Sequence, residues 1–252
     1  MKGPQRAGDA QSLPGMAAYK RGEYRRALRK LRPLAEKGEA AAQLMLGTMN
    51  EEGRGVVQNF LEAEKWYRLS AEQGNVKAQL RLGMMYHQGK GVLQSYREAV
   101  KWYRMAAEQG HAKTQFNLAY MYERGKGVSQ SYPDALFWYR RAAEQGFALA
   151  QSNLGDLHYY GRGVAQNFDE ALKWYKMAAE KGNAPAQSNL GVMYFHGRGV
   201  PKNFVLAHMW NNLAAAQGNK RAKLIRDTVS KQMTPEQIVE AQTMASEWKP
   251  KP

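Results

Sequence analysis

The sequence contains no cysteine among its 252 residues. This absence excludes a disulfide framework, a thiolate nucleophile and a cysteine-ligated zinc site. There is also no run of about 18 apolar residues, so no transmembrane helix is expected. The N-terminal stretch MKGPQRAGDAQSLPG lacks the apolar segment of a secretory signal peptide. Because a signal removed by cleavage would leave no trace, these absences leave the cellular compartment open.

Acidic side chains are scarce relative to basic ones. The chain has 22 Asp and Glu against 37 Lys and Arg, which gives a formal net charge of +15. Hydrophobic residues make up 44% and charged residues 23% of the sequence. This composition is typical of a soluble folded protein, and is too apolar for a disordered chain.

A repeat with a period of 36 residues runs along most of the chain. A tryptophan, a glycine, a glutamine and a pair of glycines all recur at this spacing. The four series are Trp66, Trp102, Trp138, Trp174, Trp210; Gly74, Gly110, Gly146, Gly182, Gly218; Gln43, Gln79, Gln115, Gln151, Gln187; and Gly53/Gly55, Gly89/Gly91, Gly125/Gly127, Gly161/Gly163, Gly197/Gly199. Four series in one register indicate a tandem repeat of one structural unit.

Each unit has the hydrophobic pattern of two helices. In residues 150–158, small and apolar side chains fall on one side of a helix that turns by about 100° per residue. The Gly161-Arg162-Gly163-Val164 segment then favours a bend. A second amphipathic pattern over residues 171–179 ends at Gly182, and glycine is the usual residue at a helix C-terminus. Each unit is therefore predicted to be a helical hairpin.

Glycine also recurs inside the first predicted helix, at Gly47, Gly83, Gly155 and Gly191. Within a helix, glycine costs about 1 kcal/mol relative to alanine. We therefore expect a neighbouring Trp or Tyr ring to approach the helix closely at these positions. Ala119 takes the same position in another repeat, which indicates that one methyl group still fits there.

These motifs resemble the Sel1-like repeat family, whose 36-residue units are relatives of tetratricopeptide repeats. The signature is A-x-A-Q-x-x-L-G-x-x-Y-x-x-G-x-G-V followed by A-x-x-W-Y-x-x-A-A-E-x-G. Residues 75–110 match it almost throughout, and the resemblance covers about residues 17–218. The departures are Asn50 and His158 in place of Tyr, Lys30 in place of Trp, and Asn211-Asn212 after Trp210. The resemblance implies an all-α fold, an α/α superhelical solenoid of about six hairpins with capping helices.

The predicted organisation has three parts. Residues 1–14 form a flexible N-terminal segment. Residues 15–218 form the solenoid, with a degenerate first hairpin over residues 15–38 and repeats from residue 39 onward. Residues 219–252 form C-terminal capping helices and a tail, because the last repeat of a solenoid has no neighbour to cover it.

The C-terminal part contains two helix signals outside the repeat. Residues 221–231 are predicted to be helical, although they lack the Gln and Leu-Gly landmarks. A last helix is predicted to start at Thr234 as N-cap, with Pro235 at the first helical position and Gln237 at the capping-box position.

No motif assembles catalytic chemistry, so we expect no enzymatic activity, no cofactor, no metal and no small-molecule substrate. The G-[RK]-G-V loop occupies the same place in each repeat, which favours a turn, because phosphate-binding loops follow a strand. The S-x-x-K pattern at residues 246–249 stands without the other motifs of serine acyltransferases. None of the histidines shows zinc-ligand spacing; they are His87, His111, His158, His196 and His208.

The candidate binding surface is the side of each first helix that faces away from the predicted core. A helix side that meets only solvent carries Lys, Glu, Gln and Ser, whereas this one carries large apolar and aromatic residues, as binding surfaces do. By resemblance, it corresponds to the concave positions through which tetratricopeptide repeats hold peptides. The candidate groove residues are Leu80, Met84, His87, Phe116, Asn117, Tyr120, Arg124, Asn153, Asp156, Tyr159, Tyr160, Asn189, Val192, Phe195 and His196. The same pattern places Leu44, Ser152 and Ser188 on this side of the helices. The alternative is that curvature lets these side chains pack on one another as additional core.

Asn117, Asn153 and Asn189 form a row in register within this surface. Each side-chain amide offers a donor and an acceptor, so such a row suits the backbone of an extended peptide. The alternative is that Asn is simply common at this repeat position.

The excess positive charge is concentrated in the first hairpin. Residues 1–38 carry 10 Lys and Arg against 3 Asp and Glu. We call the following cluster the basic cap: Lys20, Arg21, Arg25, Arg26, Arg29, Lys30 and Arg32. Such a cluster can attract nucleic acid, anionic lipid or an acidic envelope polymer. The alternative is a solvated end that keeps the solenoid from stacking.

The sequence thus predicts a monomeric, non-enzymatic scaffold or adaptor that binds a peptide or protein segment in the groove of the first helices. The alternative function is docking through the basic cap on an anionic polymer or membrane surface. Members of the family are often exported or envelope-associated bacterial proteins. The resemblance therefore implies the periplasm, the envelope or secretion if a signal peptide has been removed, and the cytoplasm otherwise.

Overall fold

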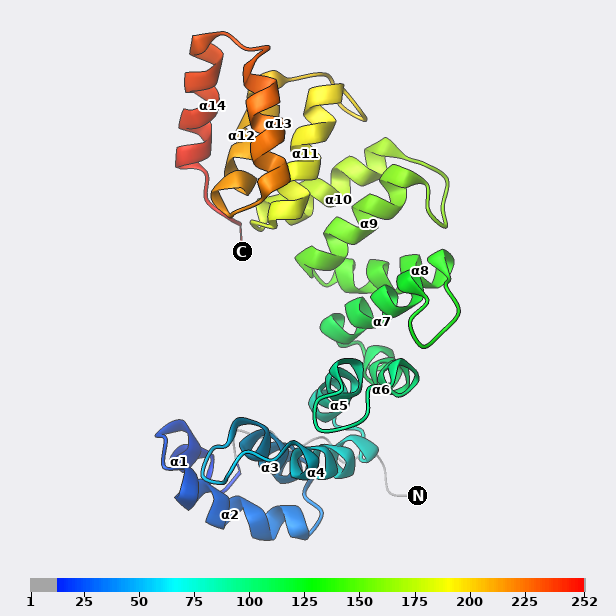
Figure 1. Cartoon of the computed structure of the whole chain (residues 1–252), viewed down its shortest axis with the longest axis vertical. Coiled ribbons are helices and arrows are strands. Elements are labelled where there is room, and N and C mark those ends of the chain that lie inside the picture. The colour runs from blue at the N-terminus through cyan, green and yellow to red at the C-terminus, as the bar shows by residue number, and fades with distance from the viewer. Residues whose placement is uncertain (1–12, 252) are drawn as a thin grey trace. The chain divides into compact units, whose positions relative to one another are not determined.

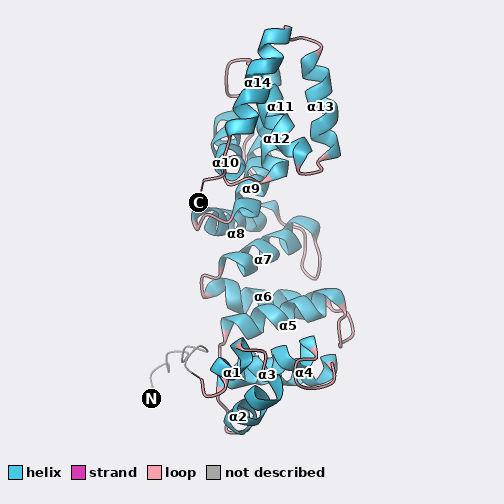
Figure 2. Ribbon diagram, turned by 90° about the vertical axis from the view of Figure 1, so that its left-hand side faces the viewer, coloured by secondary structure: helices cyan, strands magenta, loops and turns pink. Residues whose placement is uncertain are grey.

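We describe residues 13–251 in a computed structural model of the chain. The predicted flexible segment 1–14 lies outside these residues, apart from Leu13 and Pro14. Every regular element in residues 13–251 is an α-helix, and the helices are joined by turns and short loops (Figure 2). Among the same residues, no helix has the length and apolar character needed to cross a membrane. The predicted all-α class is confirmed.

The helices fall into two compact units, which we describe separately. The first unit ends at Gln130 and the second begins at Ser131. The first contains α1 (Met16–Lys20), α2 (Tyr24–Glu36), α3 (Ala40–Glu52), α4 (Phe60–Glu72), α5 (Val76–Gln88), α6 (Tyr96–Glu108) and α7 (Ala112–Arg124) (Figure 1). The second contains α8 (Tyr132–Glu144), α9 (Ala148–Tyr160), α10 (Phe168–Glu180), α11 (Ala184–His196), α12 (Phe204–Ala216), α13 (Lys220–Ser230) and α14 (Pro235–Glu247). Successive helices pack on one another in chain order from α1 to α7 and from α8 to α13, which is the arrangement of an α/α solenoid, and α14 packs on α12.

The helix boundaries are set by caps that repeat with the same period. Second helices start after Asn59, Ser95, Ser131, Asn167 and Asn203, and each of these side chains accepts a hydrogen bond from the backbone N–H three residues on. This bond satisfies one of the free N–H groups of the first turn. First helices end at Gly53, Gly89, Gly125, Gly161 and Gly197, which are left-handed, with φ between 63° and 69°. Glycine adopts this conformation without strain, so it ends the helix at the predicted turn.

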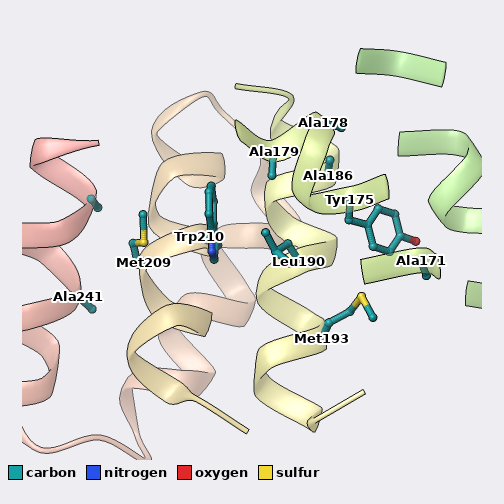
Figure 3. Packing of buried hydrophobic residues seen from close by; sticks show 11 residues of the cluster. Ala171, Tyr175, Ala178, Ala179, Ala186, Leu190, Met193, Met209, Trp210 and Ala241 are labelled. Carbon is teal, nitrogen blue, oxygen red and sulfur yellow. The ribbon is translucent and has the colours of Figure 1, made fainter. Parts of the chain in front are cut away.

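Tyrosines form the centre of the core. Tyr67, Tyr103, Tyr139 and Tyr175 directly follow the repeated tryptophans and are among the largest fully buried side chains. Of the tryptophans, Trp102, Trp174 and Trp210 are buried, whereas Trp66 and Trp138 are half-buried. In the second unit, Tyr175 and Trp210 belong to one cluster with Leu190, Met193 and Ala241, so this core extends into α14 (Figure 3).

The glycines inside the first helices allow a ring to approach closely, as predicted, and the ring is that of tyrosine. A Cβ atom added to Gly155 would lie 2.6 Å from Cδ1 of Tyr175. At Gly191 the neighbour is the side chain of Asn211, which takes the place of the tyrosine. Asn211 is fully buried, and its Nδ2 donates a 2.8 Å hydrogen bond to the Ala207 carbonyl.

The repeated glutamines join one hairpin to the next. Each Nε2 donates to the carbonyl of an alanine near the end of the preceding helix, at 3.0 to 3.2 Å. The pairs are Gln43 with Ala35, Gln79 with Ala71, Gln115 with Ala107, Gln151 with Ala143, and Gln187 with Ala179. These bonds satisfy carbonyl groups that a helix end leaves without a partner.

The C-terminal helix signals are confirmed. Helix α13 begins one residue before its predicted start. At α14, Thr234 Oγ1 accepts from the Gln237 backbone N–H at 3.3 Å, and Gln237 Oε1 accepts from the Thr234 N–H at 3.0 Å. This is the predicted capping box.

Candidate functional site

The candidate groove residues lie on four helices, α5 and α7 in the first unit and α9 and α11 in the second. We call the surface that they form in each unit the first-helix face. None of them is buried. Arg124, Tyr160 and His196 are exposed and the other twelve are half-buried.

The first-helix face is narrower than the sequence predicts. Leu44, Ser152 and Ser188, which the pattern assigns to it, are instead buried. The reason is that α3, α9 and α11 each pack both on the second helix of their own hairpin and on that of the preceding hairpin. Ser188, for example, faces α12, where its hydroxyl lies 3.3 Å from Oδ1 of Asn211.

In the first unit, aromatic groups of this face pack partly on their own chain. The ring of His87 packs edge-on against Tyr96, with ring centroids 5.4 Å apart. Burial, and after it the nearby Lys126 ammonium, lower the pKa of His87, so the ring is neutral at pH 7. The ring of Tyr120 lies beneath two cations, with Arg124 Cζ at 5.6 Å and Lys126 Nζ at 5.7 Å from its centroid. These contacts hold the rings in fixed orientations at the surface.

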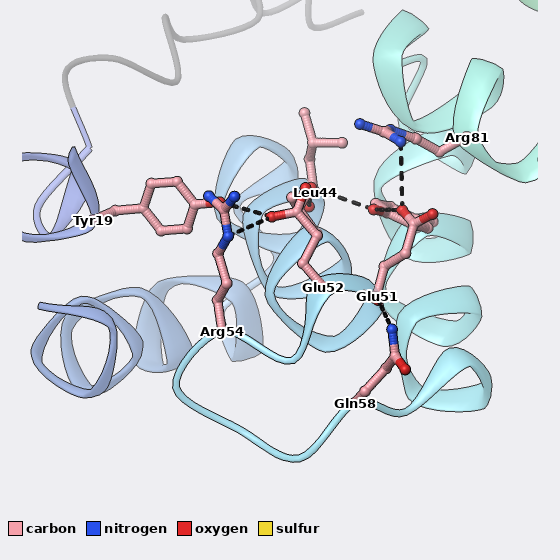
Figure 4. Close-up of polar contacts among 9 residues, drawn as sticks. Tyr19, Leu44, Glu51, Glu52, Arg54, Gln58 and Arg81 are labelled. Carbon is pink, nitrogen blue, oxygen red and sulfur yellow. Dashed lines mark hydrogen bonds and ion pairs between the residues drawn. The ribbon is translucent and has the colours of Figure 1, made fainter. Parts of the chain in front are cut away.

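On α3, the positions equivalent to the first-helix face carry the acidic residues Glu51 and Glu52. Arg81 approaches the Glu51 carboxylate to 3.6 Å (Figure 4). Tyr67 donates a 2.6 Å hydrogen bond to Oε2 of Glu51, and Lys90 also approaches the carboxylate to 3.6 Å. Burial is the largest cause, and the Glu51 bond the second, of the raised pKa of Tyr67, which stays protonated as the donor. The Glu51 carboxylate is therefore paired with side chains of this chain.

In the second unit, the aromatic side chains are also arranged in contact with one another. Tyr159 packs edge-on against Tyr160 and Phe168, at centroid distances of 4.9 and 5.3 Å. Tyr160 remains 52% exposed. Phe195 packs on Phe204 in a tilted arrangement, with ring centroids 5.8 Å apart.

A chain of hydrogen bonds runs from the core of the second unit to its surface. Tyr175 donates to Oδ1 of Asp156 at 2.6 Å, and Asn189 Nδ2 donates to the same oxygen at 3.0 Å. Arg221 Nη1 in turn donates to Oδ1 of Asn189 at 3.2 Å. Burial, and after it the Asp156 charge, raise the pKa of Tyr175, so its hydroxyl remains a donor. The Asp156 carboxylate thereby orients the Asn189 amide, and Asn189 orients Arg221.

The row of asparagines is used partly within the chain. Asn189 bonds to Asp156 and Arg221, and Asn153 Nδ2 donates to the Tyr139 hydroxyl at 2.9 Å. These amides are therefore less available to a peptide backbone than the sequence suggests.

An apolar groove of about 300 Å³ opens between α11 and α13. We call it the α11/α13 groove. Its lining is predominantly apolar, and Leu224 is 69% exposed within it. The residues that line it are Val192, Phe195, His196, Arg221, Leu224, Ile225 and Thr228. Three of these belong to the predicted groove.

The α13 wall of this groove is not among the predicted groove residues, because α13 is predicted from the sequence only as a capping helix. The signal was nonetheless present. Steps of 36 from Ser188 and Val192 arrive at Leu224 and Thr228, so α13 continues the register of the first helices. Continuing the repeat beyond Gly218 would have identified it.

The basic cap is exposed along its whole length, on α1, α2 and the turn between them. Arg21 and Arg26 pair with Glu23, at 2.6 and 3.1 Å. Beside it, Arg54 donates to the Tyr19 hydroxyl at 2.8 Å and pairs with Glu52 at 2.8 Å (Figure 4).

The cation of the G-[RK]-G-V loop packs on aromatic rings, several of them at the start of a second helix. Arg54, for example, lies over Tyr24, Lys90 over Phe60 and Lys126 over Tyr96, at 5.4, 4.4 and 5.1 Å from the ring centroids. The repeat pattern predicts turns at these loops, but it does not predict this contact. Within residues 13–251, no group of three His, Asp or Glu side chains is placed to hold a metal ion.

These features define a class of protein: an α/α solenoid of 36-residue hairpins with an aromatic and partly charged surface on its first helices. Five tandem copies of the Sel1 repeat match residues 40–75, 76–111, 112–147, 148–183 and 184–219, so the chain belongs to the Sel1 repeat family. A Sel1 repeat protein from Oxalobacter formigenes has a similar structure, with a TM-score of 0.82 and 36% identity, over 93% of this chain and 98% of that one.

A second solved structure is that of c5321, a protective antigen present in uropathogenic Escherichia coli strains that displays an SLR fold. Its TM-score is 0.47 at 24% identity, over 96% of this chain and 76% of that one. No curated protein matches the sequence. Proteins of the Sel1 repeat family are generally protein-interaction scaffolds and typically have no enzymatic activity.

Proposed function

We propose that this chain is a non-enzymatic scaffold that binds a segment of a protein partner on its first-helix face. The observation that carries the proposal is the α11/α13 groove, where α11 and α13 leave apolar side chains open to solvent. Contiguous apolar surface that is open to solvent commonly marks a site where a partner binds. The exposed ring of Tyr160 on α9 adds a large aromatic group in the same unit.

The side chains of this face are held before a partner arrives. Tyr159 is packed by Phe168 and hydrogen-bonded by Arg198, and Phe195 is packed by Phe204. Because these side chains are already ordered, binding of a partner costs them little additional conformational entropy, which favours affinity. Aromatic anchors held in this way are typical of interface hot spots.

The experiment has two stages. The full chain is used to capture partners from native lysate, and each partner identified by mass spectrometry is then purified. Hydrogen exchange of the chain is measured with and without that partner. The proposal expects slowed exchange in α7, α9, α11 and α13, the helices that carry Tyr120, Tyr160 and the groove. Slowed exchange confined to α1 and α2 would contradict it.

The basic cap supports a second candidate function, docking on an anionic polymer or membrane surface. Arg25, Arg29 and Arg32 are spaced along one side of α2 and are exposed, and no carboxylate among the described residues pairs with them. Uncompensated arginines at this spacing form a local positive field.

Salt dependence separates the two candidates. Binding to a polyanion through the basic cap falls steeply with salt, because counterions are released from the polymer. Binding that depends on aromatic contacts changes little between low and moderate salt. The measurement is the Kd of each captured partner at two salt concentrations, with Arg25→Ala/Arg29→Ala as the variant that removes the cap charge.

A further inference from the structure

We propose that the α11/α13 groove selects partner segments that carry an aspartate or glutamate beside a bulky apolar side chain. The apolar side chain enters the groove, and the carboxylate pairs with Arg221 at its edge. This inference rests on the proposed function and names the chemical class of the partner segment.

The apolar half of the site is the groove itself. Val192 and Phe195 on α11 face Leu224 and Ile225 on α13. A volume of about 300 Å³ is at the lower end for a binding pocket, so it suits one or two large side chains rather than an extended ligand. The exposure of Leu224 shows that nothing in the described chain covers this wall.

The polar half is the Arg221 guanidinium. Its one hydrogen bond within the described residues runs from Nη1 to the Asn189 amide, and no carboxylate in that part of the chain pairs with it. A guanidinium has five N–H donors, so the remaining donors are available for a carboxylate. The contacts from Asp156 to Asn189 and on to Arg221 hold the group in place beside the groove. A pre-oriented guanidinium favours bidentate pairing with a carboxylate.

The charges around the groove favour an acidic partner over a basic one. Helix α11 contains no Asp or Glu. Helix α13 carries four basic residues and a single carboxylate, Asp227, which is paired with Arg226 at 2.8 Å. No acidic residue lines the groove. An incoming lysine or arginine would therefore meet the Arg221 cation and no carboxylate in the groove lining, whereas an incoming carboxylate is complementary to Arg221.

The first test is an unbiased selection. A phage library of random 12-residue peptides is selected on the immobilised full chain, with elution by excess soluble chain. The expected result is enrichment of peptides that combine Asp or Glu with Leu, Ile, Met, Phe or Trp. Enrichment of basic peptides, or of apolar peptides without an acidic residue, would overturn the inference.

The second test assigns the two halves of the site to their residues. The most enriched peptide is synthesised with a fluorescent label, together with a version in which its Asp and Glu are replaced by Asn and Gln. Binding of both is measured by anisotropy on the chain and on the variants Arg221→Gln and Leu224→Gln. The matched controls are Arg97→Gln and Val239→Gln, which remove an exposed arginine and an exposed valine that do not line the groove.

For the acidic peptide, we expect Arg221→Gln and Leu224→Gln each to raise Kd at least tenfold, and both controls to leave it unchanged. For the amide peptide, we expect weaker binding that Arg221→Gln no longer affects, because the pairing is already lost. If Leu224→Gln weakens binding but Arg221→Gln acts equally on both peptides, the carboxylate pairing is wrong while groove binding stands. If no enriched peptide depends on Leu224, the groove itself is wrong, and the proposed function fails at this site.

Discussion

Gln217 donates a 2.8 Å hydrogen bond to Oε1 of Gln187, whose own Nε2 is bonded to the Ala179 carbonyl. The same pairing joins Gln73 to Gln43 and Gln109 to Gln79, at 2.7 and 2.9 Å. Each repeat glutamine in these pairs is thus satisfied at both ends of its amide. In one repeat of the second unit, the glutamine amide oxygen lacks this hydrogen bond.

The exception is Gln151. Lys181 stands where the donor glutamine would be, and its Nζ bonds to the Gly146 carbonyl at 2.9 Å. Oε1 of Gln151 is left buried without a hydrogen-bond partner. An unsatisfied buried acceptor costs about 1–3 kcal/mol, so Lys181→Gln should stabilise the second unit by roughly 1 kcal/mol. Urea unfolding of this variant measures the effect.

The control for this prediction is Lys176→Gln, which removes an exposed lysine from α10, the helix that Lys181 directly follows. It should leave the free energy of unfolding within about 0.5 kcal/mol of the parent chain. Equal effects of the two substitutions would show that the Gln151 acceptor is not what limits stability here.

Trp102 fills the core of the first unit together with Leu82 and Met85. It is 2% exposed. Trp102→Ala should lower the free energy of unfolding by about 3–5 kcal/mol, the usual effect of emptying a large aromatic site. Trp66→Ala should cost less, because Trp66 is half-buried. A melting temperature that Trp102→Ala leaves unchanged would contradict the assigned packing.

Gly155 tests the close approach of the tyrosine ring. Alanine is favoured over glycine in a helix by about 1 kcal/mol. However, the new Cβ would lie 2.6 Å from the buried Tyr175 ring, which is also held by its bond to Asp156. Ala119 shows that a repeat can form with a methyl group at this position, but at Gly155 the Tyr175 ring lies too close for one. Gly155→Ala should therefore destabilise the chain by about 1–3 kcal/mol, as overpacking does. Stabilisation, measured by urea unfolding, would show that the ring moves away without cost.

Two buried histidines of the second unit predict a loss of stability in mild acid. Burial is the main cause that lowers the pKa of His158 and of His208; at His158, Glu170 opposes this and Arg140 adds to it. Both nitrogens of the His158 ring lack a hydrogen-bond partner. In the unfolded chain a histidine has a pKa of about 6.5, so below that pH the unfolded state binds more protons than the folded state.

Stability should therefore be fully present above about pH 6.5 and fall as the pH drops below it. His158→Phe removes one of the two groups and should flatten this fall. The measurement is the free energy of unfolding at pH 7.5 and pH 5.5 for the parent chain and for the His158→Phe variant. The same loss in the variant as in the parent would exclude His158 as a source of the pH dependence.

Much of the fold could be predicted from the sequence, because every hairpin must pack on the next in the same way and so repeats its landmarks. The turn at Gly161 and the cap at Thr234 lie where the pattern places them. The pattern could not decide which of two adjacent aromatic residues, Trp174 or Tyr175, is the more deeply buried. Both are large and apolar, and only the packing against Gly155 shows that the tyrosine ring comes closest.

The candidate site was predicted in part. The period places Val192 and Phe195 at the surface, where they line the groove. It could not show that Ser188 is buried against Asn211. The helical pattern of apolar residues predicts one buried side for a helix, whereas α11 is covered on two sides, by α10 and by α12. The other wall, around Leu224, was missed because α13 lacks the landmark residues of the repeat.

The central claim, that a protein partner binds the first-helix face, is tested most directly by the affinity of a captured partner for Tyr160→Ala and Tyr120→Ala. The rings of Tyr160 and Tyr120 lie at the surface, so helicity and melting temperature should be nearly unchanged. We predict that Tyr160→Ala and Tyr120→Ala each raise the Kd for the partner by roughly 30-fold, equivalent to about 2 kcal/mol for a hot-spot aromatic. Arg25→Ala and Arg29→Ala should leave Kd unchanged. Normal affinity of both tyrosine variants, with loss of affinity in the arginine variants, would contradict the account and place the docking site at the basic cap.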